Sequence, residues 1–543
     1  MKRLFALLSR YPRITTYSLL GLSAVLTGLT LIFPVLWWLE WISMIPLGVA
    51  LLSLASDKTV KLSRLYGLGV FYFFCYGLVC FHWFIHLYPL SFIDGMTPPA
   101  ALAVVLAGSV GLSFFQSLFG GLVFLFAGLL FRSDLAARHP FLRPFTAAAL
   151  WAIYEWSQTF GWFGVPWGRL PLGQLGFLPG AQTASLFGSY GITFVLIAVN
   201  FCLAYAIRYR ENIKLRVPLL CVTAMLVFQY GAGAILQNIH GKPCGEITVS
   251  VIQGNVASGE KWTSDSREKI FTVYENETRM AAEEGAEIVI FPETALPYSL
   301  ENGRYARLFC QTLAADCGVT VLAGGYTSGE NGEEYNSLVC FLPDGSVHET
   351  VYAKRHLVPF GEYVPLQALI AAVIPPLAEL NLSGLALTEG TDAAVYELEE
   401  GRLGALICFD SIYEELSLDS VRSGAQLLCI ATNDSWFTDS AALRMHNGQA
   451  RLRAIETGRT VVRSANTGIS SVISSHGQIL SQLDILTEGH LTATVTLYEH
   501  TTLYSAVGNL PILLITLLLC IWLGADTGHR LHAKHRERRA KKH

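Results

Sequence analysis

Long runs of apolar residues with few charges fill the first 237 residues of the chain, and one more such run lies near its end. A helix needs about 20 apolar residues to cross roughly 30 Å of hydrocarbon, so the pattern predicts eight membrane-spanning helices. Residues 245–500 have the mixed pattern of a water-facing domain. The expected spans are 14–33, 35–55, 65–88, 99–131, 145–160, 185–207, 216–237 and 503–524.

Within residues 245–500, short β-rich runs alternate with helix-like segments, which is typical of a layered α/β domain. Residues 265–284, 302–316 and 442–457 are predicted as helices. Eight runs are predicted as strands, and these could form one large sheet or two packed sheets. The predicted strands are "EITVSVIQGNV", "EIVIFPE", "VTVLAGGYT", "NSLVCFLP", "ALICFDS", "LLCIATND", "TVVRSANTG" and "SSVISSHG".

Lysine and arginine indicate the orientation of the spans, because both residues accumulate on cytoplasmic loops. They cluster at the N-terminus and in alternate connections, whereas the intervening connections are nearly bare. Seven crossings from a cytoplasmic N-terminus place the soluble domain outside, and the eighth returns the tail to the cytoplasm. The predicted domains are a membrane domain at 1–237, an outward catalytic domain at 245–500, a last span at 503–524 and a basic tail at 525–543.

The composition supports a membrane protein, since 52% of the 543 residues are hydrophobic and only 15% are charged. The net charge of −4 averages two compartments and indicates little. The basic tail fits an orientation signal and a contact with anionic lipid, so we expect no nucleic-acid partner. The 11 cysteines show no Cys-x-x-Cys or Cys/His spacing of a zinc site, and we expect no metal.

Reactive side chains follow several of the predicted strands. "IVIFPE" ends in Glu293, "ALIC" in Cys408 and "LLCIATND" in Asn433 and Asp434, and Lys354 follows the strand-like "ETVYAK". Open α/β sheets bind ligands beyond the carboxyl ends of their strands. These residues therefore define a candidate site.

The residue types suit acyl transfer by a cysteine nucleophile. A thiol with a pKa near 8.5 is mostly protonated at neutral pH and needs an adjacent base, which Glu293 could supply. Lys354 could face the oxyanion of the tetrahedral intermediate. Taken singly, each residue could instead be structural, as a turn cap, a solvated charge or a packed thiol. Glu362 is an acid in a stiff apolar loop, an unusual place for an idle carboxylate.

Several motifs of the chain resemble one family. "FPETALP", "YAKRHLVPFGEYVP" and "ICFDSIYEE" are similar to the Glu, Lys and Cys motifs of the nitrilase, or carbon-nitrogen hydrolase, superfamily. "VIQGNVASGEKW", "ATNDSWF" and "RLRAIETGRTVVRSANTGIS" agree, and the membrane layout resembles the apolipoprotein N-acyltransferase family. The resemblance covers essentially the whole chain. It implies a polytopic α-helical membrane domain plus an α/β nitrilase-like αββα sandwich.

The resemblance also implies roles for individual residues. Glu293 would be the general base, Lys354 would stabilise the oxyanion, and Cys408 would become a thioester. Glu362 matches an additional essential glutamate that orients the lysine or a proton path. Supporting positions are Asp410 and Asn433, and aromatic positions near the substrate are Trp262, Phe409, Trp436 and Phe437.

The nucleophile motif departs from the family in one respect. Acyltransferases of this family often have Cys-Tyr-Glu, whereas this chain has Cys408, Phe409 and Asp410. An aspartate at this position is common in the soluble amidases of the superfamily. The motif alone therefore favours amide hydrolysis, and the role of Asp410 is an open question at this point.

By resemblance, the enzyme would move an acyl chain from a phospholipid to the α-amine of the diacylglyceryl-cysteine of apolipoproteins. It would act as a monomer, without a cofactor, in the bacterial inner membrane, with the catalytic domain in the periplasm and both termini in the cytoplasm. One alternative is a membrane-tethered amidase or nitrilase. The other is a non-catalytic receptor or transporter whose outward domain only binds a ligand.

Three further features lie at or near bilayer depth. Residues 366–387 are unusually apolar and are predicted to dip into the membrane interface at the acyl entrance; a covered core segment is the equal alternative. Glu155 is expected to bond the outer loop "GWFGVPWGRLPLGQ" in a structural role. His82 and His86 could simply lie at the interface.

Overall fold

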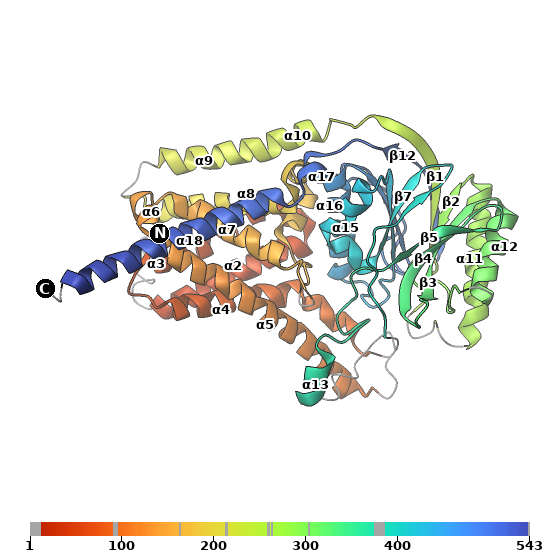
Figure 1. Cartoon of the computed structure of the whole chain (residues 1–543), viewed down its shortest axis with the longest axis horizontal. Helices are drawn as coiled ribbons and strands as arrows, with labels where there is room; N and C mark the ends of the chain where they lie inside the picture. Colours follow the sequence, from red (N-terminus) through yellow and green to blue (C-terminus); the bar gives the residue numbers. More distant parts are fainter. Residues whose placement is uncertain are drawn as a thin grey trace.

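The computed structural model describes residues 12–90, 96–161, 164–211, 215–257, 261, 264–301, 304–373 and 386–540. A helical region is joined end to end with a domain built on two β-sheets (Figure 1). α2 (Pro12–Ile32) begins and α18 (Leu510–Ala540) ends at the end of the helical region that faces away from the sheets. The two parts of the predicted fold class, a helical region and an α/β domain, are thus both present.

Seven helices among the described residues are long and apolar enough to cross a membrane. They are α2 (Pro12–Ile32), η1 (Pro34–Trp41) with α3 (Ile45–Ser56), α4 (Leu62–Cys80), α5 (Pro98–Phe131), α8 (Ala184–Arg208), α9 (Arg216–Val227) with η5 (Phe228–Ala232) and α10 (Gly233–Leu236), and α18 (Leu510–Ala540). Two predicted spans have different bounds. The short helix η2 (His82–Leu87) follows α4, and α17 (Leu503–Val507) is separated from α18 at Gly508, whose φ of +55° interrupts the helix.

The remaining predicted span, residues 145–160, corresponds to α7 (Leu142–Ser157), which has only 16 residues. At 1.5 Å per residue this is about 24 Å, less than the hydrocarbon thickness. The helix still runs between the two ends of the bundle. Arg143 at its start contacts Phe131 at the end of α5, whereas Glu155 near its other end contacts Leu170 in the outer loop. Shorter elements in this region are α6 (Asp134–Arg138), η3 (Leu170–Gly176) and η4 (Leu178–Gly180).

The soluble domain contains two six-stranded sheets, in the orders β12-β1-β2-β3-β4-β5 and β11-β10-β9-β8-β7-β6. Each sheet contains three neighbouring parallel strands, β1, β2 and β3 in the first and β7, β8 and β9 in the second. The remaining strands pair antiparallel. The sequence left one or two sheets open, and the structure has two. The strands are β1 (Pro243–Gln253), β2 (Ile288–Ile290), β3 (Thr320–Ser328), β4 (Glu334–Phe341), β5 (Val347–Ala353), β6 (Val395–Glu397), β7 (Arg402–Ile407), β8 (Leu427–Thr432), β9 (Thr460–Ala465), β10 (Ser471–Ile473), β11 (Ile479–Gln482) and β12 (Gly489–Tyr498).

The sheets pack face to face with helices outside, so the predicted αββα sandwich is confirmed. Alternation along β2 shows why: Ile288 and Ile290 face the core between the sheets, whereas Val289 faces the helices. Helices α11 (Ser264–Glu283) and α12 (Tyr305–Cys317) cover the first sheet (Figure 1). Helices α15 (Glu414–Arg422) and α16 (Ala441–Thr457) lie between the second sheet and the helical region.

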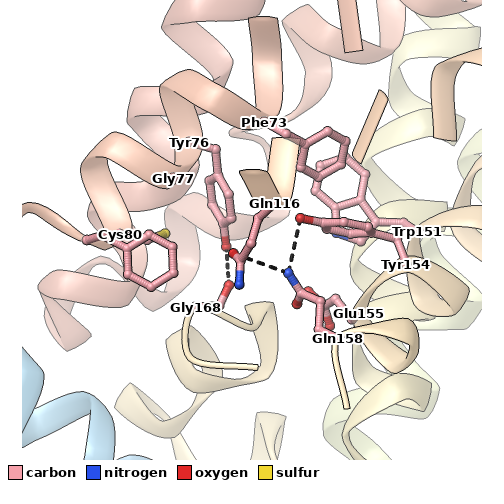
Figure 2. Close-up of a pocket in the computed structure, with 11 residues that line it drawn as sticks. Phe73, Tyr76, Gly77, Cys80, Gln116, Trp151, Tyr154, Glu155, Gln158 and Gly168 are labelled. Carbon is pink, nitrogen blue, oxygen red and sulfur yellow. Dashed lines mark hydrogen bonds between the residues drawn. The ribbon is translucent and has the colours of Figure 1, made fainter. Parts of the chain in front are cut away.

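Polar side chains inside the bundle hold the loop that follows α7. Tyr76 donates to the carbonyl of Gly168 at 2.6 Å (Figure 2), and Glu155 accepts from the backbone N–H of Leu170 at 3.1 Å. The expected structural role of Glu155 is confirmed. The space among these side chains is about 10 Å³, room for about one water molecule and too little for an organic ligand.

Other expectations for the membrane interface are only partly covered by the described residues. Residues 374–385 lie outside them, so the dip of 366–387 stays a prediction; within its described part, α13 (Gln367–Val373) exposes Leu369, and Leu366 beside it is also exposed. His82 and His86 lie in η2, beyond the end of α4. His86 contacts Thr438 of the soluble domain at 3.4 Å.

Candidate active site

Lys354 lies between two buried carboxylates. Its Nζ atom is 2.8 Å from Oε1 of Glu293 and 2.9 Å from Oε1 of Glu362. The three residues are 1%, 5% and 8% exposed. Charges buried to this degree need a partner, and here each carboxylate is paired with the same ammonium. The structure therefore brings together three of the residues that the sequence predicted.

The strand ends place these groups. Glu293 follows β2 by three residues, and Lys354 directly follows β5, where its backbone N–H donates to the carbonyl of Asn336 at 2.8 Å. The Asn336 side chain donates to Glu293 at 2.8 Å and to Glu362 at 3.0 Å. Sequence reasoning missed Asn336. A polar residue near the start of the apolar strand β4 is the signal that could have revealed it.

The second oxygen of Glu293 is held by the other sheet. Its Oε2 accepts from the backbone N–H of Asn433, just after β8, at 2.8 Å. The Asn433 side chain instead accepts from Asn466 at 3.1 Å. The predicted supporting residue Asn433 is therefore at the site, and it contacts Glu293 through its backbone. Glu293 is fixed from both sheets at once.

Cys408 lies in a turn with unusual backbone geometry. It directly follows β7 and opens the short helix η6 (Cys408–Ile412), with a φ of +50°. Few residues other than glycine adopt this region, and such strain concentrates at functional sites. Burial and the charge of Glu293 raise the pKa of the Cys408 thiol well above its usual value, against the opposing effect of Lys354. The resting group is a thiol, so attack requires a base.

Asp410 ties the nucleophile turn to the segment that carries Lys354. Its Oδ2 accepts from the Tyr352 hydroxyl at 2.8 Å and from the Ile407 backbone at 3.1 Å, and its Oδ1 accepts from the His356 backbone at 2.8 Å. Burial raises the pKa of this carboxyl group. The structure thus answers the open question about Asp410. The aspartate, which stands where the family often has glutamate, holds the Cys408 turn against the segment that carries Lys354.

A second buried network lies against the backbone of Cys408. Asp434 pairs with Arg463 at 2.6 Å and with Nδ1 of His446 at 3.0 Å, and Nε2 of His446 lies 3.2 Å from the Cys408 carbonyl. Although burial raises it, Arg463 and His446 leave the pKa of Asp434 below its usual value.

Cys408, Asp434 and His446 form a described group with the composition of a metal site, with donor atoms within 4.8 Å of one another. Both carboxylate oxygens of Asp434 are already hydrogen-bonded, however, and a buried guanidinium lies beside them. A divalent cation would have to displace that arginine. The donor set therefore does not suit a metal.

Lys261 is a further cation near Glu293 that sequence reasoning missed. It is 2% exposed, and its Nζ donates to the carbonyl of Thr294 at 2.5 Å. Burial lowers the pKa of Lys261 to about 8, against the opposing effect of Glu293. The neighbouring predicted residue Trp262 lies outside the described residues.

The other predicted aromatic residues occupy different surroundings. Phe437 packs against Trp83 and Trp167 of the helical region, with ring centroids 5.0 and 5.6 Å apart. Trp436 is half-buried beside it, whereas Phe409 is buried in the core. Phe437 thus lies where the soluble domain meets the bundle, and contact with substrate stays a prediction for all of them.

Arg169 links the membrane region to the nucleophile turn. It is fully buried in the loop after α7. Its guanidinium donates to the carbonyl of Ile412, the last residue of η6, at 2.8 Å and to Glu414 at 2.8 Å. Arg453 of α16 pairs with Glu414 at 3.5 Å and Glu456 at 2.7 Å. Nothing local in the sequence indicates this cluster.

Comparison with known families covers most of the chain. Residues 23–202 match the model of the apolipoprotein N-acyltransferase N-terminal domain, and residues 248–503 match that of carbon-nitrogen hydrolases. An apolipoprotein N-acyltransferase of Geobacter metallireducens is 33% identical over 372 residues, covering 66% of this chain and 70% of the relative. One of Gloeobacter violaceus is 30% identical over 492 residues, covering 89% of each chain.

Solved structures resemble the soluble domain. An amidase of Nesterenkonia AN1 from the nitrilase superfamily matches with 18% identity and a TM-score of 0.36, over 47% of this chain and 92% of its own. A Saccharomyces cerevisiae protein from branch 10 of that superfamily matches with 17% identity and a TM-score of 0.38, over 50% and 97%.

Proposed function

The chain belongs to the apolipoprotein N-acyltransferase family, and we propose that it transfers an acyl chain from a membrane phospholipid to lipoproteins through a thioester on Cys408. It is an acyltransferase of lipoprotein biosynthesis with membrane helices. The phospholipid donor, the thioester and the roles of the site residues belong to the proposal.

In the first half-reaction Glu293 accepts the thiol proton of Cys408 and the sulfur attacks an ester carbonyl of the phospholipid. The tetrahedral oxyanion is stabilised by the ammonium of Lys354. Collapse breaks the ester C–O bond, and the leaving alkoxide takes the proton from Glu293. A lysophospholipid departs, and the acyl chain stays on Cys408 as a thioester.

In the second half-reaction the free α-amine of the diacylglyceryl-modified N-terminal cysteine attacks the thioester. Glu293 accepts a proton from the amine and returns one to the departing thiolate. The products are an amide and the regenerated thiol. The same base and the same oxyanion donor serve both steps.

The observation that carries the proposal is the placement of Lys354 between Glu293 and Glu362, in electrostatic reach of Cys408. Burial lowers the pKa of this lysine, but the two carboxylates raise it well above its usual value. Lys354 therefore stays an ammonium and acts as an oxyanion donor, leaving Glu293 as the base. Glu362 and Asn336 position that pair.

We further propose that the enzyme is a monomer of the bacterial inner membrane, with its soluble domain in the periplasm and both termini in the cytoplasm. The start of α2 and the end of α18 both lie towards the end of the helical region that faces away from the sheets (Figure 1). The basic residues of the N-terminus and the tail support a cytoplasmic location for that end. No cofactor is required by the proposed steps.

Intact-mass measurement of the purified full chain after mixing with phospholipid tests the proposal. We expect one acyl adduct, absent in Cys408→Ser, which disappears on addition of a diacylated lipopeptide as the triacylated product forms. An active enzyme that yields only hydrolysed product would favour the amidase alternative. Full complementation of a strain lacking this activity by Cys408→Ser would favour the non-catalytic alternative.

A further inference from the structure

A cleft of about 550 Å³ opens where α15 of the soluble domain meets α17 and the start of α18. The sheet domain lines it with the charged residues Arg355, Glu415, Asp419 and Arg422, and α18 lines it with Leu510 and Leu513. Glu293, Lys354, Glu362 and Cys408 do not line it. The cleft has the size of a small-ligand site and is separate from the candidate active site.

Arg422 offers an open guanidinium to this cleft. Its Nε donates to the carbonyl of Ser505 at 3.0 Å, and no acidic side chain forms an ion pair with it in the described part of the chain. A Cβ atom on Gly508 would lie 2.8 Å from Nη2 of Arg422, so the guanidinium lies close against the backbone of this glycine. An arginine fork with free Nη atoms suits a phosphate group.

Two carboxylates face the same space. Asp419 accepts from Arg355 at 3.0 Å, and its side chain is 41% exposed. Glu415 is exposed to the same extent and has a 3.5 Å contact with His356. Two arginines and two acids give the cleft no net charge, with cationic and anionic groups side by side. This arrangement matches a zwitterion better than a simple anion.

On one side the cleft is continuous with the exposed apolar surface of α18. Leu510 and Leu513 in the first turn of α18 are 51% and 48% exposed, and Leu514, Leu517 and Leu518 below them are also exposed. Only 6% of the apolar stretch of this helix is buried inside the protein. The charged groups thus lie just above the hydrocarbon, at the depth of lipid headgroups.

We propose that this cleft binds the headgroup of a zwitterionic aminophospholipid. The phosphate lies on Arg422, the ammonium lies between Glu415 and Asp419, and the acyl chains follow the exposed leucines of α18. Such a lipid joins the soluble domain to the last span and is not the acyl donor. A soluble ligand would not use the leucines, and an anionic lipid would place its charge beside two carboxylates.

Lipid binding to the full chain in detergent, counted by native mass spectrometry, tests the inference. A Cys408→Ala background removes turnover, so the result is independent of the proposed reaction. We expect phosphatidylethanolamine to bind in preference to phosphatidylglycerol. Arg422→Gln should weaken the binding of one phosphatidylethanolamine molecule about tenfold or more, as expected for loss of a charge-assisted contact. Arg279→Gln, an exposed arginine on α11, is the matched control.

Two further variants test the parts of the site separately. The double variant Glu415→Gln, Asp419→Asn should reverse the preference towards phosphatidylglycerol, because the ammonium partners are gone and the arginines remain. Gly508→Ala should act like Arg422→Gln by displacing the guanidinium.

Three results would overturn the inference. They are unchanged binding in Arg422→Gln, a wild-type preference for phosphatidylglycerol, and equal binding of glycerophosphoethanolamine, which has the headgroup without acyl chains.

Discussion

Two buried charge clusters lie near the turn that carries Cys408, and each combines two carboxylates with two cations. The first, called the catalytic cluster after the role proposed for it, consists of Glu293, Glu362, Lys354 and Lys261. The interface cluster consists of Glu414, Glu456, Arg169 and Arg453. Both are almost completely closed to solvent. They differ in the chemistry of their cations, since one contains lysines and the other arginines.

Arginine suits a cluster that only holds parts together. A guanidinium stays charged in proteins and presents a fork of donors. Arg169 uses this fork to contact Glu414 and the Ile412 carbonyl together. Although burial raises it, the two arginines leave the pKa of Glu414 below its usual value. The Glu414 carboxylate therefore stays ionised, whereas burial raises the pKa of Glu456 against the opposing effect of Arg453.

Lysine suits a cluster that reacts. Its pKa responds to the surroundings, and the two lysines here are shifted in opposite directions: Lys354 upward by its two carboxylates and Lys261 downward, to about 8, by burial. Neither Glu293 nor Glu362 is held by a guanidinium among the described contacts. The proposed reaction uses Glu293, which has no guanidinium partner among these contacts, as its base.

The largest effect should come from breaking the interface cluster. Arg169→Met leaves the buried Glu414 with one weaker partner, and loss of one member of a buried ion pair costs about 3–5 kcal/mol of unfolding free energy. Thermal and chemical unfolding in detergent measure this change. Arg169→Lys keeps the charge but loses the fork and should show a smaller loss. Wild-type stability of Arg169→Met would show that the cluster does not hold the two regions together.

Placing a guanidinium in the catalytic cluster should remove activity and leave the fold intact. Lys354→Arg keeps the positive charge, but its larger planar group does not fit between Glu293 and Glu362. We expect the rate of Cys408 acylation to fall about 10²- to 10³-fold, the usual effect of losing an oxyanion donor, while the enzyme stays folded with a smaller loss of stability than Arg169→Met. Single-turnover mass spectrometry measures the rate. A near-normal rate would mean that charge alone suffices at this position.

Lys261→Met should stabilise the protein at neutral pH. The pKa of Lys261 is lowered to about 8 in the folded state, compared with about 10.4 when unfolded. Holding the ammonium at pH 7 therefore costs about 3 kcal/mol. This cost shrinks as the pH rises from 8 towards 10.4, because the folded state then binds fewer protons than the unfolded state.

Unfolding of Lys261→Met and wild type at pH 7 and pH 10 checks that sign. The gain should be present at pH 7 and nearly absent at pH 10. Cys408 acylation should slow in the same variant, because the turn of Thr294 beside Glu293 loses its contact. The control is Lys269→Met, at an exposed position in the neighbouring helix α11, which should change neither the stability nor the rate of acylation. A pH-independent gain would mean that the charge of Lys261 is not the cause.

The smallest predicted effect concerns the resting thiol. The charge of Glu293 raises the pKa of Cys408, so Glu293→Gln should increase the thiolate fraction while it removes the base. We expect alkylation of Cys408 by iodoacetamide at pH 8 to become severalfold faster, even though acylation is lost. Peptide mass mapping follows the label at Cys408. Slower alkylation in the variant would mean that Glu293 also activates the thiol towards small reagents.

Local patterns in the sequence were sufficient to predict the helical region, the α/β domain and the strand ends that carry the candidate site residues. Glu293, Lys354 and Cys408 could be proposed because each has a reactive side chain and ends or directly follows a predicted or strand-like segment, where α/β sheets bind ligands. Glu155 could be assigned to the outer loop from its position in a span. The strands β6, β11 and β12 were missed. β6 and β11 have only three or four residues at a sheet edge and carry little periodicity, and the ten residues of β12 contain no continuous apolar run.

Contacts between distant segments could not be predicted in this way. Lys354 and Glu293 are 61 residues apart, and Arg169 and Glu414 are 245 apart. Asn336 and Lys261 look like ordinary polar residues in the sequence. In the structure both are buried, Asn336 against Glu293 and Lys261 against Thr294. Asp410 looked like an unexplained substitution until its three hydrogen bonds were visible.

The sequence by itself determined which segments are apolar enough to cross a membrane, where most of the strands lie, and which strand ends carry an acid, a lysine and a cysteine, because hydropathy, periodicity and residue type are local properties. Only the tertiary structure decided which charges share a buried site, how the pKa of each is shifted, and how the membrane loop supports the nucleophile turn. The physical reason is that burial and charge pairing depend on what surrounds a group in space, and those neighbours come from every part of the chain.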